Sequence, residues 1–483
     1  MKRTASLVLA AALAGCALKP VPPLDDTRKQ ALPNAVVPAQ WTGAPTVPGP
    51  VPEALFWTVG DPTLDALIAE ALTYNADLRS AGTRVAQAAG YLRAAGATLY
   101  PAVQLLGRGG GKLGGDSSGL QGALISASWE LDLWGRVRYG EAAAAAQLAA
   151  TEYDYYYARA SIAALVAKSW FMASEARQQR ELARAAVVDS EQFVGLSRER
   201  ERIGRGDQYD IALAGANLET LRDAQRQSEL AYVQAQRPLE TLLGRYPAAA
   251  LDASPGFAPL PAPIPAGLPS ELLERRPDVL AAERRVAAAF DLTEQAKVAQ
   301  LPRISLTAGV SSVSSELFVL KDTNNPVVSF GANIVAPLYQ GGALRANVDV
   351  RTAEQAQAVA DFARVAQRAF SEVENALASE IAARDRAPIL ARAAQENARA
   401  VELAGVRFNV GSADLRPLLQ QQVVLYGARS AQLRMEGEQR VQRVNLYLAL
   451  GGDFGAMRIP PPEIPVDYSP FASGTGGGTS TAH

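Results

Sequence analysis

The chain has 483 residues, a formal net charge of −2 and 48% hydrophobic residues. This balanced charge lacks the basic excess of a nucleic-acid-binding protein, so we expect no nucleic-acid partner. The length would suit about three ordinary domains. After the N-terminus no apolar run is long enough for a membrane-spanning helix, and hydropathy alone would describe a soluble protein. The elements along the chain argue against that description.

The N-terminus has the layout of a secretory signal peptide, with Lys2 and Arg3 before the apolar run 7–13. The run Leu-Ala-Gly-Cys ending at Cys16 resembles a bacterial lipobox. We therefore predict that residues 1–15 are removed and that Cys16 carries a covalent lipid. Ala17 stands where lipoproteins retained in the inner membrane usually carry aspartate, which favours the outer membrane. The alternative is an ordinary signal peptide with a chance cysteine. Because the chain has a single cysteine, we expect no disulfide.

The first half is predicted to contain short helices, a strand pair and a long helical hairpin. Residues 16–60 form a lipid anchor and a Pro-rich extended leader. Asp61-Pro62 begins the first repeat, 61–245, as a capping residue followed by a first-turn proline. A strand pair at 102–132 and a hairpin at 136–243 follow. The first helix of that hairpin would be about 100 Å long if continuous.

The second half repeats this order. After a Pro-rich linker at 246–269 comes the second repeat, 270–453. It comprises helices at 270–299, a strand pair at 303–338 and a hairpin at 342–450, in which Pro388 predicts a kink and not an end. The tail 454–483 is predicted to be disordered. A buried helical seam is expected at six positions spaced three or four apart: Val359, Phe362, Ala366, Ala369, Val373 and Ala376.

Each predicted strand pairs an apolar face with a face of small polar residues, which is the pattern of a transmembrane β-barrel. A half-buried soluble sheet has the same alternation and stays an alternative. Four strands cannot close a barrel, and an open edge in lipid leaves backbone groups unpaired. We therefore predict a mainly α fold that is internally duplicated. Four strands per chain complete a twelve-stranded trimeric barrel, continuous with a long α-helical coiled-coil tunnel.

The run 268–279 is similar to the hallmark of TolC-like outer-membrane factors, in particular the NodT-type efflux lipoproteins of resistance–nodulation–division (RND) pumps. The segments 337–342 and 448–452 are similar to further signatures of that family. The resemblance implies a homotrimer in the outer membrane that extends into the periplasm. It also implies two partners, a periplasmic adaptor and an inner-membrane RND pump. The signature residues are Pro269, Ser270, Leu273, Glu274, Arg275, Arg276, Pro277 and Asp278.

In that family the helical hairpins turn at the periplasmic tip, where the adaptor docks and the duct narrows. Gln420 stands where many relatives have a carboxylate at the closed aperture. The gate candidates here are therefore Asp414, Arg416 and Gln420, with Asp414 and Arg416 as a hypothetical inter-subunit ion pair. Two solvated turn residues are the alternative. The tip residues predicted to contact the adaptor are Gly204, Gly206, Asp207, Asp210, Gly411 and Ser412.

We predict no enzymatic activity. The run 109–114 fits G-x-G-x-x-G, but no helix follows it, so a nucleotide site is not expected. The only histidine is His483, and without a Cys/His cluster we expect no metal and no cofactor apart from the lipid on Cys16. Trp129 and Trp134, near a strand end, suit either an interfacial aromatic girdle or a packed core.

The leading functional hypothesis is a passive outer-membrane exit duct for small molecules such as drugs, within a tripartite efflux system. The exit duct of a type I protein-secretion system is one alternative, and a lipid-anchored structural periplasmic rod is another. The sequence does not indicate the substrate.

Overall fold

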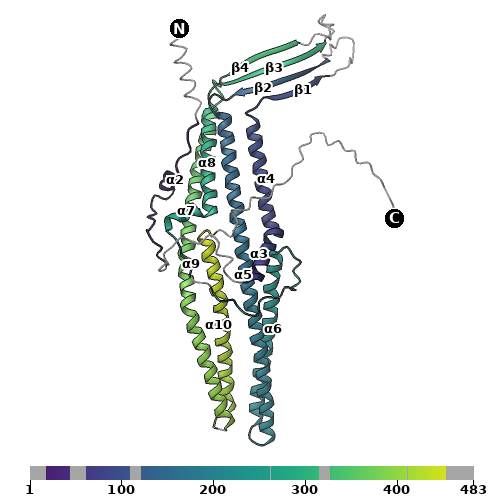
Figure 1. Cartoon of the computed structure of the whole chain (residues 1–483), viewed down its shortest axis with the longest axis vertical. Helices are drawn as coiled ribbons and strands as arrows, with labels where there is room; N and C mark the ends of the chain where they lie inside the picture. Colours follow the sequence, from purple (N-terminus) through teal and green to yellow (C-terminus); the bar gives the residue numbers. More distant parts are fainter. Residues whose placement is uncertain are drawn as a thin grey trace, which may run out of the picture.

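The computed structural model describes residues 18–43, 61–108, 121–260, 263–314, 327–410 and 412–452. The predictions for 1–15, Cys16, Gly411 and 454–483 fall outside these ranges. The molecule is elongated, with a sheet at one end and two helical hairpins reaching the other (Figure 1). In chain order the elements are α2 (Leu24–Ala31), α3 (Pro62–Tyr74), α4 (Ala76–Ala97), β1 (Ala102–Arg108), β2 (Gln121–Leu131), α5 (Arg136–Arg202), α6 (Gln208–Leu242), η2 (Pro269–Glu271), α7 (Leu272–Arg275), α8 (Pro277–Val298), β3 (Arg303–Ser314), β4 (Val327–Val335), α9 (Ala343–Asn409) and α10 (Leu415–Ala449).

The long helices that the sequence predicts are present. Helices α5 and α9 each have 67 residues, and each is followed by a return helix of 35 residues. Helix α9 continues through Pro388. Gly135 and Gly342 precede the two long helices with φ of 79° and 86°, a region that glycine enters without steric cost. These glycines lie between each strand and the helix that follows it.

The four strands form one antiparallel sheet in the order β1-β2-β3-β4. Its register sets Leu105 opposite Ile125, Ile125 opposite Val310 and Val310 opposite Val328. All four side chains are exposed, and one face of the sheet is therefore continuously apolar. The other face carries small or polar residues in matching register: Gln104, Ser126, Gly309 and Ser329. Within the described residues, β1 and β4 each have one edge without a partner strand.

The order α3–α4–β1–β2–α5–α6 recurs as α7–α8–β3–β4–α9–α10, so each half contains short helices, a strand pair and a hairpin. The halves pack through α8 on α5 and through α10 on α5. The main core lies at this level, midway along the molecule, and includes Trp170 and Leu239 from the first half. All six positions of the predicted α9 seam are buried, which confirms that seam.

The leader differs from its prediction as an extended segment, because it contains the helix α2. The reason is local. Prolines at positions 22 and 23 precede the helix and Pro33 follows it, leaving a stretch without proline between them. Asp25 and Asp26 lie in the first turn and Arg28 and Lys29 in the last, the arrangement that the helix dipole favours. The density of prolines around the segment obscured this short helix.

The leader runs along α8 and α9 from the sheet to the middle of the molecule (Figure 1). Near the sheet, the Lys19 amide donates to the Tyr139 hydroxyl over 2.8 Å. At the other end Trp41 is 6% exposed, and its indole N–H donates to the Ala266 carbonyl over 3.1 Å. The Glu374 carboxylate accepts from the Thr42 amide. The described part of the leader is therefore fastened to the body at both ends.

Among the helices of the described ranges, none has an apolar stretch long enough to cross a membrane.

Candidate functional site

The residues singled out by the sequence lie in two regions. The run 268–279 lies at the junction where α8, α9 and the end of α10 meet. The tip residues lie at the far end of the hairpins, where α5 turns into α6 and α9 into α10 (Figure 1).

Arg276 holds the junction together. It is 1% exposed, and its Nε and Nη2 atoms donate to the two carboxylate oxygens of Asp278 over 3.0 and 2.8 Å. Its Nη1 lies 2.7 Å from a Glu372 carboxylate oxygen and donates to the Ala449 carbonyl over 3.0 Å. Burial opposes the charge of Arg276, but the hydrogen bonds and charges of Asp278 and Glu372 outweigh it and raise its pKa. One side chain thus ties the start of α8 to α9 and to the last turn of α10.

The first half has a smaller version of this junction at Asn75, which lies 201 positions before Arg276. The Asn75 side-chain amide donates to the Leu242 carbonyl over 3.0 Å, and its Oδ1 caps α4 at the Leu78 amide. Leu242 is the last residue of α6, as Ala449 is of α10. In both halves, therefore, a side chain just before a helix secures the end of the return helix.

The other signature residues divide by exposure. Pro269, Leu273 and Pro277 are buried, whereas Ser270 and Glu274 lie on the surface. The Glu274 carboxylate accepts from Arg28 of the leader over 3.3 Å. The signature run is thus a packing junction with a contact to the leader.

The hairpin tips are built by capping residues. At the first tip Gly204 has a φ of 73°, and the Asp207 carboxylate caps α6 by accepting from the Asp210 amide over 2.9 Å. At the second tip the Ser412 hydroxyl donates to the Arg407 carbonyl over 3.0 Å. Asp414 is the residue before α10 and makes no side-chain capping bond.

Two arginine–aromatic contacts cross from one hairpin to the other near the tips. Arg416 of α10 donates to the Tyr209 hydroxyl of α6 over 2.6 Å, and its guanidinium lies 5.2 Å from the centre of the Tyr209 ring. Arg200 of α5 lies 4.3 Å from the centre of the Phe408 ring of α9. Within the described protomer no ion pair joins Asp414 to Arg416, because Arg416 contacts the other hairpin. The inter-subunit pair stays a prediction.

The first tip carries crowded acidic groups. Partial burial raises the pKa of Asp210, and the charges of Asp207 and Asp414 raise it further, while Arg200 and Arg416 act in the opposite direction. The Gln420 side chain, the third gate candidate, is exposed on α10. Sequence reasoning missed Tyr209, since an aromatic residue in the first turn of a helix has no spacing that indicates a partner on the other hairpin.

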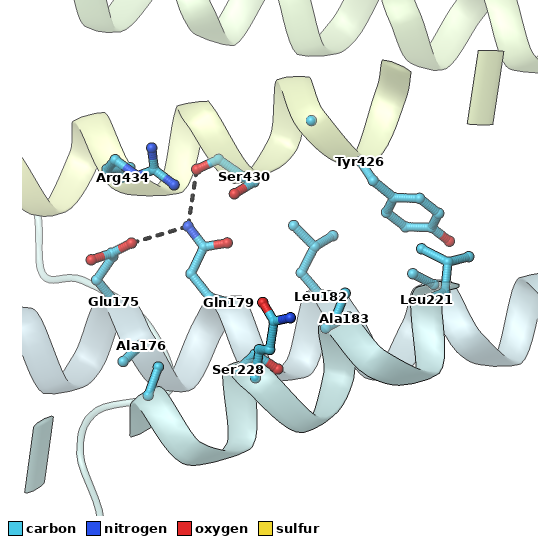
Figure 2. Close-up of a pocket in the computed structure, with 15 residues that line it drawn as sticks. Glu175, Ala176, Gln179, Leu182, Ala183, Leu221, Ser228, Tyr426, Ser430 and Arg434 are labelled. Carbon is cyan, nitrogen blue, oxygen red and sulfur yellow. Dashed lines mark hydrogen bonds between the residues drawn. The ribbon is translucent and has the colours of Figure 1, made fainter. Parts of the chain in front are cut away.

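A groove of about 540 Å³ lies between the two hairpins, above the tips. Figure 2 shows it bounded by α5, α6 and α10. At one side the Gln179 side-chain amide donates to the Ser430 carbonyl over 3.0 Å, which bridges α5 and α10. In the part of the chain that the structure describes, no three metal-ligating side chains gather into a possible metal site.

Comparison with known proteins decides the family. The sequence profile of outer membrane efflux proteins matches residues 67–245 and again residues 268–452, one match in each half of the fold. The chain belongs to the outer membrane efflux protein family. It is 30% identical to the pyoverdine export outer membrane protein OpmQ of Pseudomonas aeruginosa, covering 94% of this chain and 97% of OpmQ. It is also 30% identical to the cation efflux protein CusC of Escherichia coli K12, covering 81% and 87% of the two chains.

Solved structures agree with this assignment. The open state of the MtrE outer membrane channel of Neisseria gonorrhoeae superposes with a TM-score of 0.78 at 26% identity, covering 91% of this chain and 98% of MtrE. The outer-membrane channel OprN superposes with a TM-score of 0.79 at 25% identity, covering 87% and 97%. These matches confirm the TolC-like fold class that the sequence predicts.

The member described here is an outer-membrane efflux channel of a tripartite efflux system. It works as a homotrimer with an adaptor and an inner-membrane pump, and it extends into the periplasm. The predicted function, partners and location are thereby confirmed. The roles of the individual tip, gate and lipid-attachment residues stay predictions.

Proposed function

We propose that three copies of this chain close their sheets into one twelve-stranded barrel and conduct small molecules passively through it and the helical tube below. The unpaired edges of β1 and β4, on a sheet with a continuous apolar face, carry this proposal. In lipid each unpaired backbone group costs several kcal/mol, so an isolated four-stranded sheet would be unstable there. Pairing β1 of one copy with β4 of the next removes both edges.

The proposed cargo is a class of small molecules, and its selection is left to the pump. The relatives' own names refer to the export of pyoverdine and to the efflux of cations and of toluene. Such different cargoes within one family favour a duct without a specific binding site. We further propose that the protein catalyses no reaction and needs no cofactor. Its family consists of channel proteins, which supports this part of the proposal.

A lipid on Cys16 would anchor the chain at the base of the sheet. The described chain begins at Leu18, whose side chain lies against Gly135, where the strand β2 gives way to α5. A single residue separates Leu18 from Cys16 in the sequence. An acyl chain on Cys16 would therefore enter the membrane leaflet next to the helices. Mass spectrometry of the mature protein and of Cys16→Ser tests the modification directly.

At the tips, the contact between Arg416 and Tyr209 would hold the hairpins together and the duct closed, with Asp414 and Gln420 facing the aperture. Arg416→Ala removes the hydrogen bond and the cation–π contact. We expect it to admit vancomycin, which is too large for an intact outer membrane. Unchanged vancomycin entry and unchanged drug export would together refute a gating role for Arg416.

The channel itself is tested by conductance. Purified acylated trimer in planar bilayers should give discrete single-channel steps, whereas a structural rod would give none. Deletion of the gene should raise susceptibility to some drugs, dyes, metals or solvents, and the plasmid-borne wild type should restore resistance. A silent trimer would refute the proposed conduction.

A further inference from the structure

Midway along the molecule, α5 is covered on one side and bare on the other. Its covered side is fixed to α3 and to the linker that follows α6. The Trp170 indole N–H donates to the Asp61 carboxylate at the start of α3 over 2.8 Å. The Ser174 hydroxyl accepts from the Ser254 amide of the linker over 3.2 Å. About half a turn around α5 from these contacts lies a bare strip, whose members have the spacing of one helical face and are exposed or half-buried: Leu165, Lys168 and Met172.

The covered side of α5 faces the outside of the trimer. The leader belongs to the same layer as the linker, because the Trp41 indole donates to the Ala266 carbonyl. Helix α3, the linker and the leader would fill the bore if they lay inside the closed tube, so their place is outside it. Because α5 packs between α6 and α10, it is not at the edge of the protomer. The bare strip therefore faces the duct and not a neighbouring copy.

The second half repeats this arrangement in α9. Helices α5 and α9 begin at 136 and 343 and both have 67 residues, so positions 207 apart are equivalent. The equivalents of the bare strip are Glu372, Asn375 and Ser379, which line one polar recess of about 310 Å³. Away from this recess, the Glu374 carboxylate accepts from the Thr42 amide of the leader. Both halves thus turn equivalent residues inward, away from the outer layer.

Lys168 carries an unbalanced charge on this inner face. Among the described residues it makes no ion pair, and burial alone lowers its pKa. A lysine ordinarily titrates at about pH 10 and stays charged at pH 7. Glu372, about 5 Å nearer the sheet, is balanced by Arg276 at 2.7 Å and Arg368 at 3.6 Å. The next acid along α5 towards the tips on this face is Glu175, seven residues on and about 10 Å along the axis.

Three copies place three Lys168 side chains around the duct at one level. Each copy supplies four helices there, packed in the order α6–α5–α10–α9. Twelve helices about 8–10 Å apart form a ring about 15–19 Å in radius to the helix axes, and the half-width of a helix leaves a bore about 10–14 Å in radius. At about 12 Å in water, three positive charges concentrate a monovalent anion about threefold at 10 mM salt and hardly at all at 1 M.

We propose that the three Lys168 side chains form a basic ring in the duct, so that molecules with carboxylate, phosphate or sulfonate groups pass more readily than cations do. Rings of Lys or Arg give pores an anion preference in this way. The ring is complete only in the trimer, to which each copy contributes one lysine. Such a preference by charge needs no binding pocket, and it agrees with a duct that leaves recognition to the pump. This inference rests on the proposed conduction through the duct.

The test measures the reversal potential of single trimers in planar bilayers between about 10 mM and 100 mM KCl. Lys168→Gln removes the charge, and the anion-to-cation permeability ratio should fall at least about threefold. Lys168→Arg keeps the charge and should stay close to wild type. Asn375→Lys adds three charges at the equivalent position of α9 and should raise the ratio by about the same factor. All three differences should vanish at about 1 M salt, where the charges are screened.

Lys29→Glu is the matched control. Lys29 lies exposed on α2 in the outer layer, so this substitution changes the charge of the chain without changing the bore. It should leave the permeability ratio unchanged. Should Lys168→Gln fail to assemble, Asn375→Lys carries the test, because its position already lies in a polar recess.

A wild-type permeability ratio in Lys168→Gln and Asn375→Lys would overturn the ring, as would an equal shift in Lys29→Glu. A wild-type trimer that conducts nothing would instead overturn the proposed function, and the ring with it.

Discussion

Arg276→Met isolates the energetic role of the junction. The substitution keeps the length and apolar stem of the side chain but removes its charge. It leaves the Asp278 carboxylate buried without its main partner and the Ala449 carbonyl without a donor. Arg368, 3.6 Å from Asp278, offsets part of this loss.

The magnitude follows from burial. Breaking a buried ion pair on one side costs about 3–5 kcal/mol, because the remaining charge is uncompensated. Glu372 contributes less to this cost, since its side chain is 39% exposed. At about 2.1 cal/mol/K per residue over roughly 450 residues, 4 kcal/mol corresponds to a fall of about 4–5 °C in the thermal midpoint.

The assay is thermal unfolding of the purified trimer at one fixed scan rate. Arg222→Met is the matched control, because Arg222 pairs with Glu191 and Glu219 on the solvated surface, where ion pairs contribute little to stability. The double variant Arg276→Met with Asp278→Leu should recover part of the loss, since it removes the orphaned charge. If Arg276→Met lowers the midpoint no more than Arg222→Met does, the buried ion pair does not hold the junction.

Three further predictions concern stability. Burial next to another carboxylate raises the pKa of Asp291 from 3.8 to about 6, so the folded protein gains stability as the pH falls from 6 towards 4. Asp291→Asn should therefore stabilise the folded protein at pH 7.5 by up to about 3 kcal/mol, seen as a higher thermal midpoint, and have little effect at pH 4. A larger stabilisation at pH 4 than at pH 7.5 would contradict this. Gly244→Ala should destabilise more than Gly204→Ala, because both have positive φ but only Gly244 closely approaches another backbone segment. Trp41→Ala should cost about 3–5 kcal/mol and speed protease cleavage of the leader, whereas unchanged cleavage would mean that Trp41 does not fasten it.

Much of the fold could be predicted because its signals are local. Helices α5 and α9 are long and nearly free of breakers, and the faces of the strands alternate residue by residue. The turn at Gly204 and the cap at Asp61 follow from residue chemistry, and the Asp61 carboxylate does accept from the Thr63 amide. Helix α2 could not be predicted in the same way, because it has only eight residues and prolines flank it on both sides.

The contacts across the hairpins could not be predicted from one sequence. Tyr209 and Arg416 are 207 positions apart. No spacing rule connects residues at such distances, since their proximity depends on how the two repeats dock. For the signature run 268–279 the sequence indicates the position but not the contacts. Its position was evident, but only the structure shows that Arg276 reaches the last turn of α10.

The bare edges of β1 and β4 also bear on biogenesis. A monomer exposes two unpaired strand edges beside an apolar sheet face. Such edges pair with strands of other chains and promote aggregation. Newly exported subunits therefore have to pair with other copies of the chain, or bind a chaperone, before their strand edges pair with other proteins. Trimer assembly and membrane insertion are therefore coupled. The rate at which subunits are synthesised then affects assembly as much as the sequence does.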